Sequence, residues 1–551
     1  MKVTVDIPSV GSRELFYDHN VSVEGVLNDV SSELKYPVFL CKLDNVYRGL
    51  SHEVHHDCRI ELLDLRNSAA WATYQNSLIL IFIKAVHDTL NKDVRIDVGN
   101  SFNKGTYVKL NRDVSEEDVR AIEKRMKELV EWNLPIKKEH MSKKQAINLA
   151  YSLRQKETAE LLKSITGIGD IEIYSLADEF QIFCTLLVPS TGYCGIFELV
   201  KYAKGLLIRY PHPSDPLVIP EYEDQKLLYQ AFQEADKWGD LLGIQYVSDL
   251  NKRILNKSTK EMYQLQEALH EKKISDLADD ICSHKKRVVL ICGPSSSGKT
   301  TFAKRLCIQL KVNGHKTMYM GTDDYFVEDD QAPYDENGER DYESIRAIDT
   351  HLFVDNVKDL LDGKETDLPT YSFTTHTKSF GDRLTKIDQN TILVIEGIHA
   401  LNRQLTDGIP EEMKYKIYIS PFTPISIDHH NRISATDCRL LRRMIRDHKF
   451  RNWSCAETIN AWPKVRNGED NNIFPFHHEA DVFFNSNCIY EFAVIKKYLE
   501  PLLALITRQQ PEYAEAQRLL GFLKYFDAAD DDDIIVNTSI IREFIGGSAI
   551  A

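Results

Sequence analysis

Long apolar runs are missing from this 551-residue sequence. The longest, residues 78–86, is interrupted by Lys84 and is far shorter than the roughly 20 residues that a membrane-spanning helix needs. The first eight residues, MKVTVDIP, lack the apolar core of a secretory signal. We therefore expect a cytoplasmic protein that makes no contact with a membrane.

Cysteine pairs and a surplus of positive charge are also missing. The ten cysteines form no Cys-x-x-Cys pair, which is typical of reduced core cysteines and not of a disulfide framework. Lysine and arginine number 68 against 83 aspartate and glutamate, for a net charge of −15. From bulk electrostatics we therefore do not expect a general affinity for nucleic acid or for an anionic membrane, although a local basic site is still compatible with this balance.

The length and the hydrophobic pattern predict several domains, because 551 residues exceed what one core can bury. Residues 1–66 predict a small mixed domain, with strands at 2–7, 38–43 and 59–63 and a helix at 23–34. A second α+β unit is expected over 67–225, with strands at 171–174 and 180–188. Its clearest helix should begin at the capping box of Ser115 and Asp118.

The remaining chain divides into a helical connector, 226–286, and a third unit, 287–551. In the third unit, residues 288–291 read as a buried parallel strand, and residues 301–311 read as a helix that ends before Gly314. The segment between them is a full match to the phosphate-binding loop G-x-x-x-x-G-K-[ST]. We expect it to bind nucleotide through Gly293, Pro294, Ser295, Ser296, Ser297, Gly298, Lys299, Thr300 and Thr301.

The chemistry of this loop follows from its residue types. Glycines let backbone N–H groups point at phosphate oxygens, and the helix N-terminus adds partial positive charge. Lys299 is expected between the β- and γ-phosphates of ATP, and Thr300 offers a hydroxyl to Mg²⁺. A glycine-serine turn without a ligand is the alternative, which the flanking strand and helix disfavour.

Two acidic positions predict the rest of the reaction centre. A second buried strand, 391–395, ends in Glu396, where phosphate-loop proteins place a carboxylate near Mg²⁺. The strand that includes residues 318–320 is followed by Asp323, near the sheet edge where ligands bind. Transfer to an alcohol needs a base, and Asp323 is our choice, with Asp324 second; an acidic helix cap is the alternative.

Two further segments are candidates for ligand contacts. Tyr371, Phe373 and His376 are placed to stack on and hydrogen-bond a planar base, or else to pack in the core. A helix carries Arg439, Arg442, Arg443 and Arg446 at i, i+3, i+4 and i+7. Four guanidinium groups on one face repel one another unless anions are present, so we interpret this helix as a lid over ATP. A surface helix paired with acidic residues is the alternative.

The motifs of residues 287–500 resemble, in order and spacing, those of the uridine kinase and phosphoribulokinase family. They are the phosphate loop, Asp323-Asp-Tyr-Phe, Pro369-Thr-Tyr-Ser-Phe, Glu396-Gly-Ile-His and Arg439-Leu-Leu-Arg-Arg-Met-Ile-Arg-Asp. This resemblance implies a doubly wound parallel sheet, ATP and Mg²⁺ as cofactors, and phosphorylation of uridine or cytidine to the 5′-monophosphate.

The same resemblance implies roles for individual residues. Asp323 is the base, with Lys299 and Arg442 also catalytic; Arg442 and Arg446 contact ATP; Thr300 and Glu396 lie near the metal. Tyr371, Phe373, His376 and Arg439 surround the nucleoside. One position departs from the pattern, because Arg346 stands where we expect the acid that holds the ribose hydroxyls. An arginine there suits an anionic acceptor, so a kinase for another alcohol or a sugar phosphate is a second hypothesis.

The N-terminal half resembles modules of other proteins. Residues 1–66 are similar to the TGS domain, a β-grasp fold, and residues 67–225 to the second additional (editing) domain of threonyl- and alanyl-tRNA synthetases. The metal ligands of that editing site are largely replaced, by Tyr74, Leu78 and Val188, so we expect neither editing nor zinc there. These modules motivate a third hypothesis, an RNA- or tRNA-associated regulator with an ATP-binding switch. We also expect a homo-oligomer.

Overall fold

The computed structural model describes residues 1–102, 104–165, 169–335, 338–372 and 375–550. The first unit is a mixed sheet in the order β2-β1-β7-β4-β5, in which β1 is parallel to β7 and the other pairs are antiparallel. Val23, Val26 and Leu27 of helix α1 pack with Val3 and Ile60 of the sheet. The elements are β1 (Lys2–Ile7), β2 (Gly11–Phe16), β3 (Val21–Ser22), α1 (Val23–Asp29), β4 (Val38–Leu43), β5 (Val46–Arg48), β6 (Glu53–Val54) and β7 (Cys58–Asp64).

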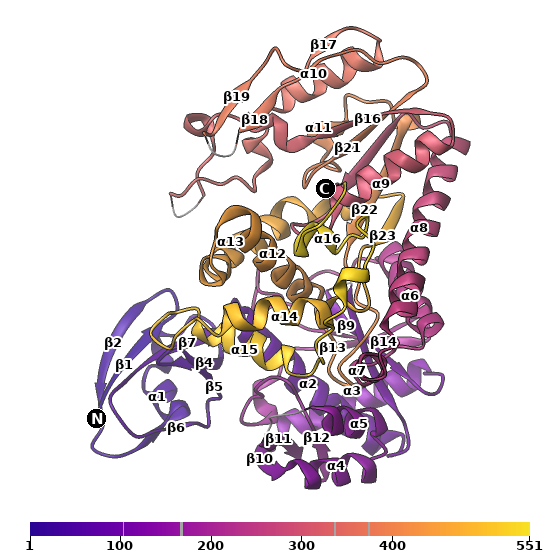
Figure 1. Cartoon of the computed structure of the whole chain (residues 1–551). Helices are drawn as coiled ribbons and strands as arrows, with labels where there is room; N and C mark the ends of the chain where they lie inside the picture. Colours follow the sequence, from indigo (N-terminus) through magenta and orange to yellow (C-terminus); the bar gives the residue numbers. More distant parts are fainter. Residues whose placement is uncertain (103, 166–168, 336–337, 373–374, 551) are drawn as a thin grey trace.

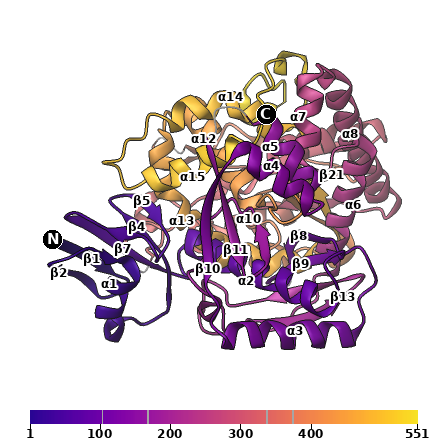
Figure 2. The same ribbon diagram turned by 90° about the horizontal axis from the view of Figure 1, so that it is seen from below.

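The second unit has a four-stranded sheet in the order β13-β14-β9-β8 and a three-stranded sheet in the order β10-β11-β12. Helix α3 starts at the predicted capping box of Ser115 and packs against α2 (Figure 2). Its elements are α2 (Ser68–Thr89), β8 (Ile96–Phe102), β9 (Gly105–Leu110), α3 (Glu116–Glu131), β10 (Ile136–Ser142), α4 (Lys143–Ser152), α5 (Lys156–Ser164), β11 (Asp170–Leu176), β12 (Glu179–Gln181), β13 (Glu198–Tyr202) and β14 (Gly205–Arg209).

One predicted strand of this unit is mostly irregular. Of residues 180–188, only the first two belong to a strand, β12. The following backbone turns to meet a loop from the C-terminal unit. There the Asn431 side chain donates to the Ile182 carbonyl (2.8 Å) and accepts from the Cys184 N–H (3.0 Å). These side-chain hydrogen bonds replace a strand ladder, which hydrophobicity alone cannot reveal.

The C-terminal unit is built on an all-parallel sheet in the order β16-β21-β15-β22-β23. Alternate residues of β15 face two different cores: Val289 and Ile291 face one, and Val288 and Leu290 face the other. A parallel sheet covered on both faces is what its unbroken β-branched runs predict. The strands are β15 (Val288–Cys292), β16 (Lys316–Gly321), β21 (Thr391–Glu396), β22 (Lys414–Ser420) and β23 (Val482–Asn485).

The parallel sheet is covered both by helices of its own unit and by helices of the connector, residues 226–286 (Figure 1). Helix α8 packs against α9, and Phe232 of α6 packs in the core of the opposite face. The helices are α6 (Lys226–Leu242), α7 (Val247–Leu255), α8 (Thr259–Ser283), α9 (Lys299–Val312), α10 (Thr350–Leu361), α11 (Arg403–Thr406), α12 (Ala435–Arg451), α13 (Cys455–Asn472), α14 (Glu491–Leu503), α15 (Tyr513–Leu523) and α16 (Arg542–Ile545).

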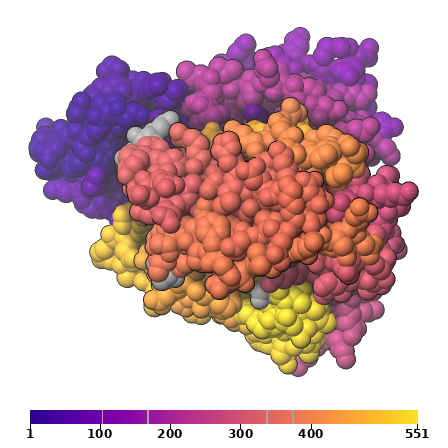
Figure 3. All heavy atoms as spheres, turned by 90° about the horizontal axis from the view of Figure 1, so that it is seen from above, coloured from indigo at the N-terminus to yellow at the C-terminus, as the bar shows by residue number. Residues whose placement is uncertain are grey.

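Residues between β16 and β21 form the outer lobe of the C-terminal unit, coloured salmon in Figure 3, beside the indigo N-terminal unit. This lobe holds α10 and four short strands: β17 (Thr366–Asp367), β18 (Thr370–Ser372), β19 (Thr377–Ser379) and β20 (Leu384–Thr385). In the described part of the chain, no helix combines the length and apolarity needed to cross a membrane.

A buried ion pair joins α12 to α14. The Arg442 guanidinium and the Glu491 carboxylate are both fully buried, with Nη2 and Oε2 2.6 Å apart. Arg442 also donates to the Ser486 carbonyl (2.9 Å), and Glu491 accepts from the Cys488 N–H (2.9 Å). The pair therefore fixes the loop between β23 and α14 as well as the two helices.

We predict that Glu491→Gln lowers the free energy of unfolding by about 3–5 kcal/mol, because it leaves the Arg442 charge buried without a counter-ion. Urea titration of the full chain measures this loss. Glu14→Gln is the control, because Glu14 forms an exposed pair with Lys2 and its loss should change little. Equal stabilities for the two variants would contradict the structural role given to the buried pair.

Candidate active site

The phosphate loop connects β15 to α9 at the carboxyl edge of the parallel sheet. Two residues of its turn have a left-handed backbone conformation, Ser296 (φ 60°) and Gly298 (φ 85°). A Cβ at Gly293 would lie 2.2 Å from the Ile419 carbonyl oxygen, so only glycine fits there. The Lys299 ammonium folds back on the loop and donates to the Pro294 carbonyl (3.2 Å).

The residues expected near the metal lie together. The Thr300 hydroxyl donates to Glu396 Oε1 (2.9 Å), and the Tyr319 hydroxyl donates to the same oxygen (2.8 Å). Thr300 opens α9 and Glu396 ends β21, so two neighbouring strands deliver these groups to one point. Hydroxyl and carboxylate oxygens are the ligands that Mg²⁺ prefers, so this pair fits the ion.

Asp323 follows β16 at the same edge and is accessible to solvent. Within the described residues, it has no hydrogen-bond or ion-pair partner. The protein raises its pKa to about 6, first through desolvation and then through repulsion from Glu396, while Lys299 opposes the shift. The neighbouring Asp324 is instead paired with Arg383 (2.6 Å). The two adjacent aspartates, both candidates for the base, therefore have different surroundings.

Aromatic side chains lie on the outer-lobe side of this edge. Tyr371 is buried against Phe326, with ring centroids 5.6 Å apart. The His376 ring stacks on Tyr342 at 5.8 Å and 26°. The third predicted contact, Phe373, lies outside the described residues. The structure thus brings Tyr371 against Phe326, the last residue of the Asp323-Asp-Tyr-Phe motif, and His376 against Tyr342, which the sequence did not single out.

The arginine helix differs from its interpretation as a lid with free guanidinium groups. Helix α12 is largely buried, and each arginine already has a carboxylate partner within the protein. The pairs are Arg439 with Glu469, Arg442 with Glu491, and both Arg443 and Arg446 with Asp447. The anions that relieve the repulsion between the four guanidinium groups are therefore carboxylates of the protein. Two of them, Glu469 and Glu491, lie far away in the sequence.

The same helix also supports the phosphate loop. Arg439 donates to the Ser295 carbonyl (3.2 Å), and Arg443 donates to the Ser295 hydroxyl (3.0 Å). Arg442 is fully buried, whereas the side chain of Arg446 keeps 18% of its surface exposed. Arg446 is thus the most accessible of the four to a bound ligand.

Arg346 lies apart from the other predicted site residues. Arg346 is exposed on the short turn Ile345–Ala347, and no described contact links it with Asp323, Lys299 or the aromatic rings. A residue that the sequence reasoning missed lies three positions earlier. Burial raises the pKa of Glu343 to about 7, while Arg443 and Lys299 oppose the rise. The charges of Arg443 and Lys299 thus act on Glu343, three residues before the position at which the sequence analysis expected an acid.

Comparisons with known proteins agree with this geometry. Residues 288–489 match the model of the phosphoribulokinase/uridine kinase family. The uridine kinases of Staphylococcus aureus strains JH9 and Newman are 31% identical over 196 residues, which is 35% of this chain and 85% of each relative.

Two solved structures are also similar over this region. One is a possible uridine kinase from Bacillus stearothermophilus, at 20% identity and a TM-score of 0.27, which covers 39% of this chain and 98% of that one. The other is a fructose transport system kinase, assigned as such only provisionally, from Silicibacter sp. TM1040, at 12% identity and a TM-score of 0.26. That match covers 38% of this chain and 98% of the other. From the family match and the curated relatives, the chain belongs to the phosphoribulokinase and uridine kinase family and is an ATP-dependent kinase.

Proposed function

We propose that the chain transfers the γ-phosphoryl group of ATP to the 5′-hydroxyl of a nucleoside, uridine or cytidine. The observation that carries this proposal is the unpaired Asp323 carboxylate at the sheet edge where Thr300 and Glu396 meet. An unpaired carboxylate beside a phosphate loop can accept a proton from an alcohol. The partly exposed ring of His376 offers a flat surface for a base, whereas the buried ring of Tyr371 packs on Phe326.

Each part of the site has a role in this proposal. The loop from Gly293 to Thr301 holds the triphosphate, and Lys299 swings from the Pro294 carbonyl to the β- and γ-phosphates. Thr300 and Glu396 would hold Mg²⁺, and the bound ion would neutralise charge on the phosphate oxygens. Asp323 orients the hydroxyl and takes its proton. Arg446 faces the phosphates, whereas Arg439 and Arg442 act by positioning the loop.

The acid that holds the ribose hydroxyls is, in our proposal, Glu343 and not a residue at position 346. Burial raises the pKa of Glu343 and the charges of Arg443 and Lys299 oppose the rise, which supports a place for this carboxyl near the phosphate loop. The exposure of Arg346 removes the main reason for an anionic acceptor. A nucleoside is therefore favoured over a sugar phosphate.

Further proposals concern the N-terminal half of the chain. We propose a TGS-like β-grasp domain over 1–66, on the mixed sheet crossed by α1, and a synthetase-like domain over 67–225. A contact with tRNA through these units, a homo-oligomeric state and a cytoplasmic location are further proposals. The most specific support for communication with the kinase is the loop 428–431, which docks into the second unit through Asn431 and His429.

A panel of acceptors separates these possibilities. ADP release should appear with uridine or cytidine and stay near background with sugar phosphates, with or without tRNA. Release only with a sugar phosphate would contradict the nucleoside proposal. Release that requires tRNA would favour the regulator hypothesis instead.

Substitution at the two aspartates tests the base. Asp323→Asn should lower kcat by roughly 10²–10⁴-fold with little change in ATP affinity, because asparagine can hydrogen-bond the hydroxyl but cannot take its proton. Asp324→Asn is the matched control and should be milder, because Asp324 pairs with Arg383. A larger loss of kcat in Asp324→Asn than in Asp323→Asn would show that Asp324, and not Asp323, is the base.

The pH dependence follows from the raised pKa of Asp323, about 6. The base works only when deprotonated, so kcat/KM for the acceptor should fall about tenfold per pH unit below pH 6. ATP protonates in a similar range, and the residual activity of Asp323→Asn provides the control. An acid limb that persists unchanged in this variant would show that another group titrates.

A further inference from the structure

The last part of the chain lies against the phosphate loop. Its apolar side chains, Ile540, Ile541, Phe544 and Ile545, are at most 3% exposed and share a core with α9 and α12. The Phe544 ring lies under the Arg442 guanidinium, 5.0 Å from the centroid. In Figure 1 this yellow segment, with α16, lies next to α9. The segment is thus part of the kinase unit and not a loose tail.

A carboxylate of this segment occupies the start of α9. Glu543 Oε2 accepts hydrogen bonds from the Thr301 hydroxyl (2.6 Å) and from the Thr301 N–H (3.3 Å). The first N–H groups of a helix have no partner within the helix, and in a phosphate loop they point at phosphate oxygens. Glu543 therefore places a negative charge where a nucleotide phosphate would accept the same hydrogen bonds.

The neighbouring Ile540 also lies against the phosphate loop. A Cβ added at Gly298 would lie 2.6 Å from Ile540 Cγ2, so this side chain rests directly on the left-handed turn of the loop. Ile540 and Glu543 therefore contact two points of the phosphate-binding segment, Gly298 and Thr301.

Anchors on both sides hold the segment in this position. The Lys449 ammonium donates to the Ile545 carbonyl, and Arg542 donates to the carbonyls of Asp532 (2.8 Å) and Ile535 (2.7 Å). The Ser539 hydroxyl donates to Glu267 (2.6 Å). Left-handed Gly546 and Gly547 follow the segment and allow the backbone to turn away.

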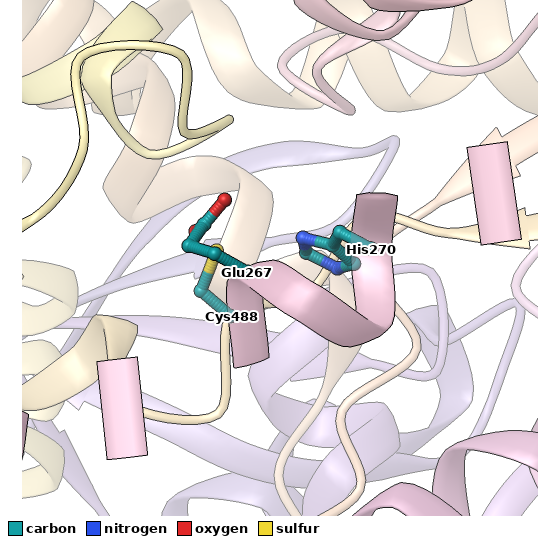
Figure 4. Close-up of side chains that lie close together, drawn as sticks. All are labelled: Glu267, His270 and Cys488. Carbon is teal, nitrogen blue, oxygen red and sulfur yellow. The ribbon is translucent and has the colours of Figure 1, made fainter. Parts of the chain in front are cut away.

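Glu267 belongs to a buried cluster with His270 and Cys488, whose ligand atoms lie within 4.8 Å of one another (Figure 4). The carboxylate of Glu267 is occupied by Ser539, by the Tyr490 hydroxyl (3.0 Å) and by Arg305 (3.4 Å). Burial lowers the pKa of His270 to about 3 and raises that of Cys488. A neutral imidazole, a neutral thiol and a saturated carboxylate form a polar anchor for the C-terminal segment.

We propose that residues 540–547 are an autoinhibitory plug, in which Glu543 holds a phosphate position of the donor site until ATP displaces it. The inference depends on ATP as the phosphoryl donor and is independent of the acceptor. ATP binding then requires the segment to open, so the apparent affinity for ATP is reduced by the fraction of molecules that are closed.

Binding of ATP to the full chain, measured by calorimetry, tests the plug. Glu543→Gln removes the charge but keeps the size of the side chain, so the apparent Kd should fall by about tenfold. Asp533→Asn is the matched control, because Asp533 lies outside the plug, its side chain is exposed, and within the described residues it makes no contact with the phosphate loop. Unchanged or weaker binding in Glu543→Gln would overturn the inference. No ATP binding in any variant would overturn the donor assignment as well.

Hydrogen exchange on the unaltered chain gives a second test that does not depend on how a variant folds. Saturating ATP should increase amide exchange at least about fivefold within residues 540–546, while amides of α9 become more protected. Protection of both segments by ATP would overturn the plug, because the C-terminal segment would then be part of the nucleotide site.

Discussion

The arrangement of the kinase unit depends on the pairing of buried arginines with carboxylates that lie far away in the sequence. Arg442 and Glu491, both fully enclosed, join α12 to the loop after β23, and the Phe544 ring packs on the same guanidinium. Arg439 and Glu469 form a second such pair beneath the phosphate loop. Removal of one partner of such a pair leaves a buried charge without a counter-ion, so each pair ties its two segments together. The loop, the helix and the C-terminal segment are therefore positioned together.

The parallel sheet and the phosphate loop could be predicted from the sequence because their signals are local. A run such as Val288–Cys292 followed by the complete loop motif leaves little freedom in its fold. The difference between Asp323 and Asp324 could not be predicted, because it comes from Arg383, 59 residues further along the chain. The neutralised arginines and the position of Glu343 depend in the same way on contacts between distant segments.

The partners of charged side chains were the feature that the sequence predicted least well. The acidic run near residue 530 has the composition of a solvated turn, yet Asp531 accepts from the Tyr263 hydroxyl (2.9 Å) and Asp532 accepts from the Tyr498 hydroxyl (2.6 Å). These contacts dock the segment that leads to the phosphate loop. Repulsion between like charges indicates that a partner must exist, but it does not say whether the partner is a ligand or another part of the chain.

The covering of the sheet by connector helices bears on where the kinase unit begins. The family resemblance starts at residue 287, which suggests a seam between the kinase unit and the chain before it. Yet α8 packs against α9, and Phe232 of α6 lies 5.1 Å from Phe422, so the seam crosses a continuous core. A mutation in the connector is then felt by the catalytic sheet. A kinase unit cut at residue 287 would therefore expose apolar surface that the connector helices now cover.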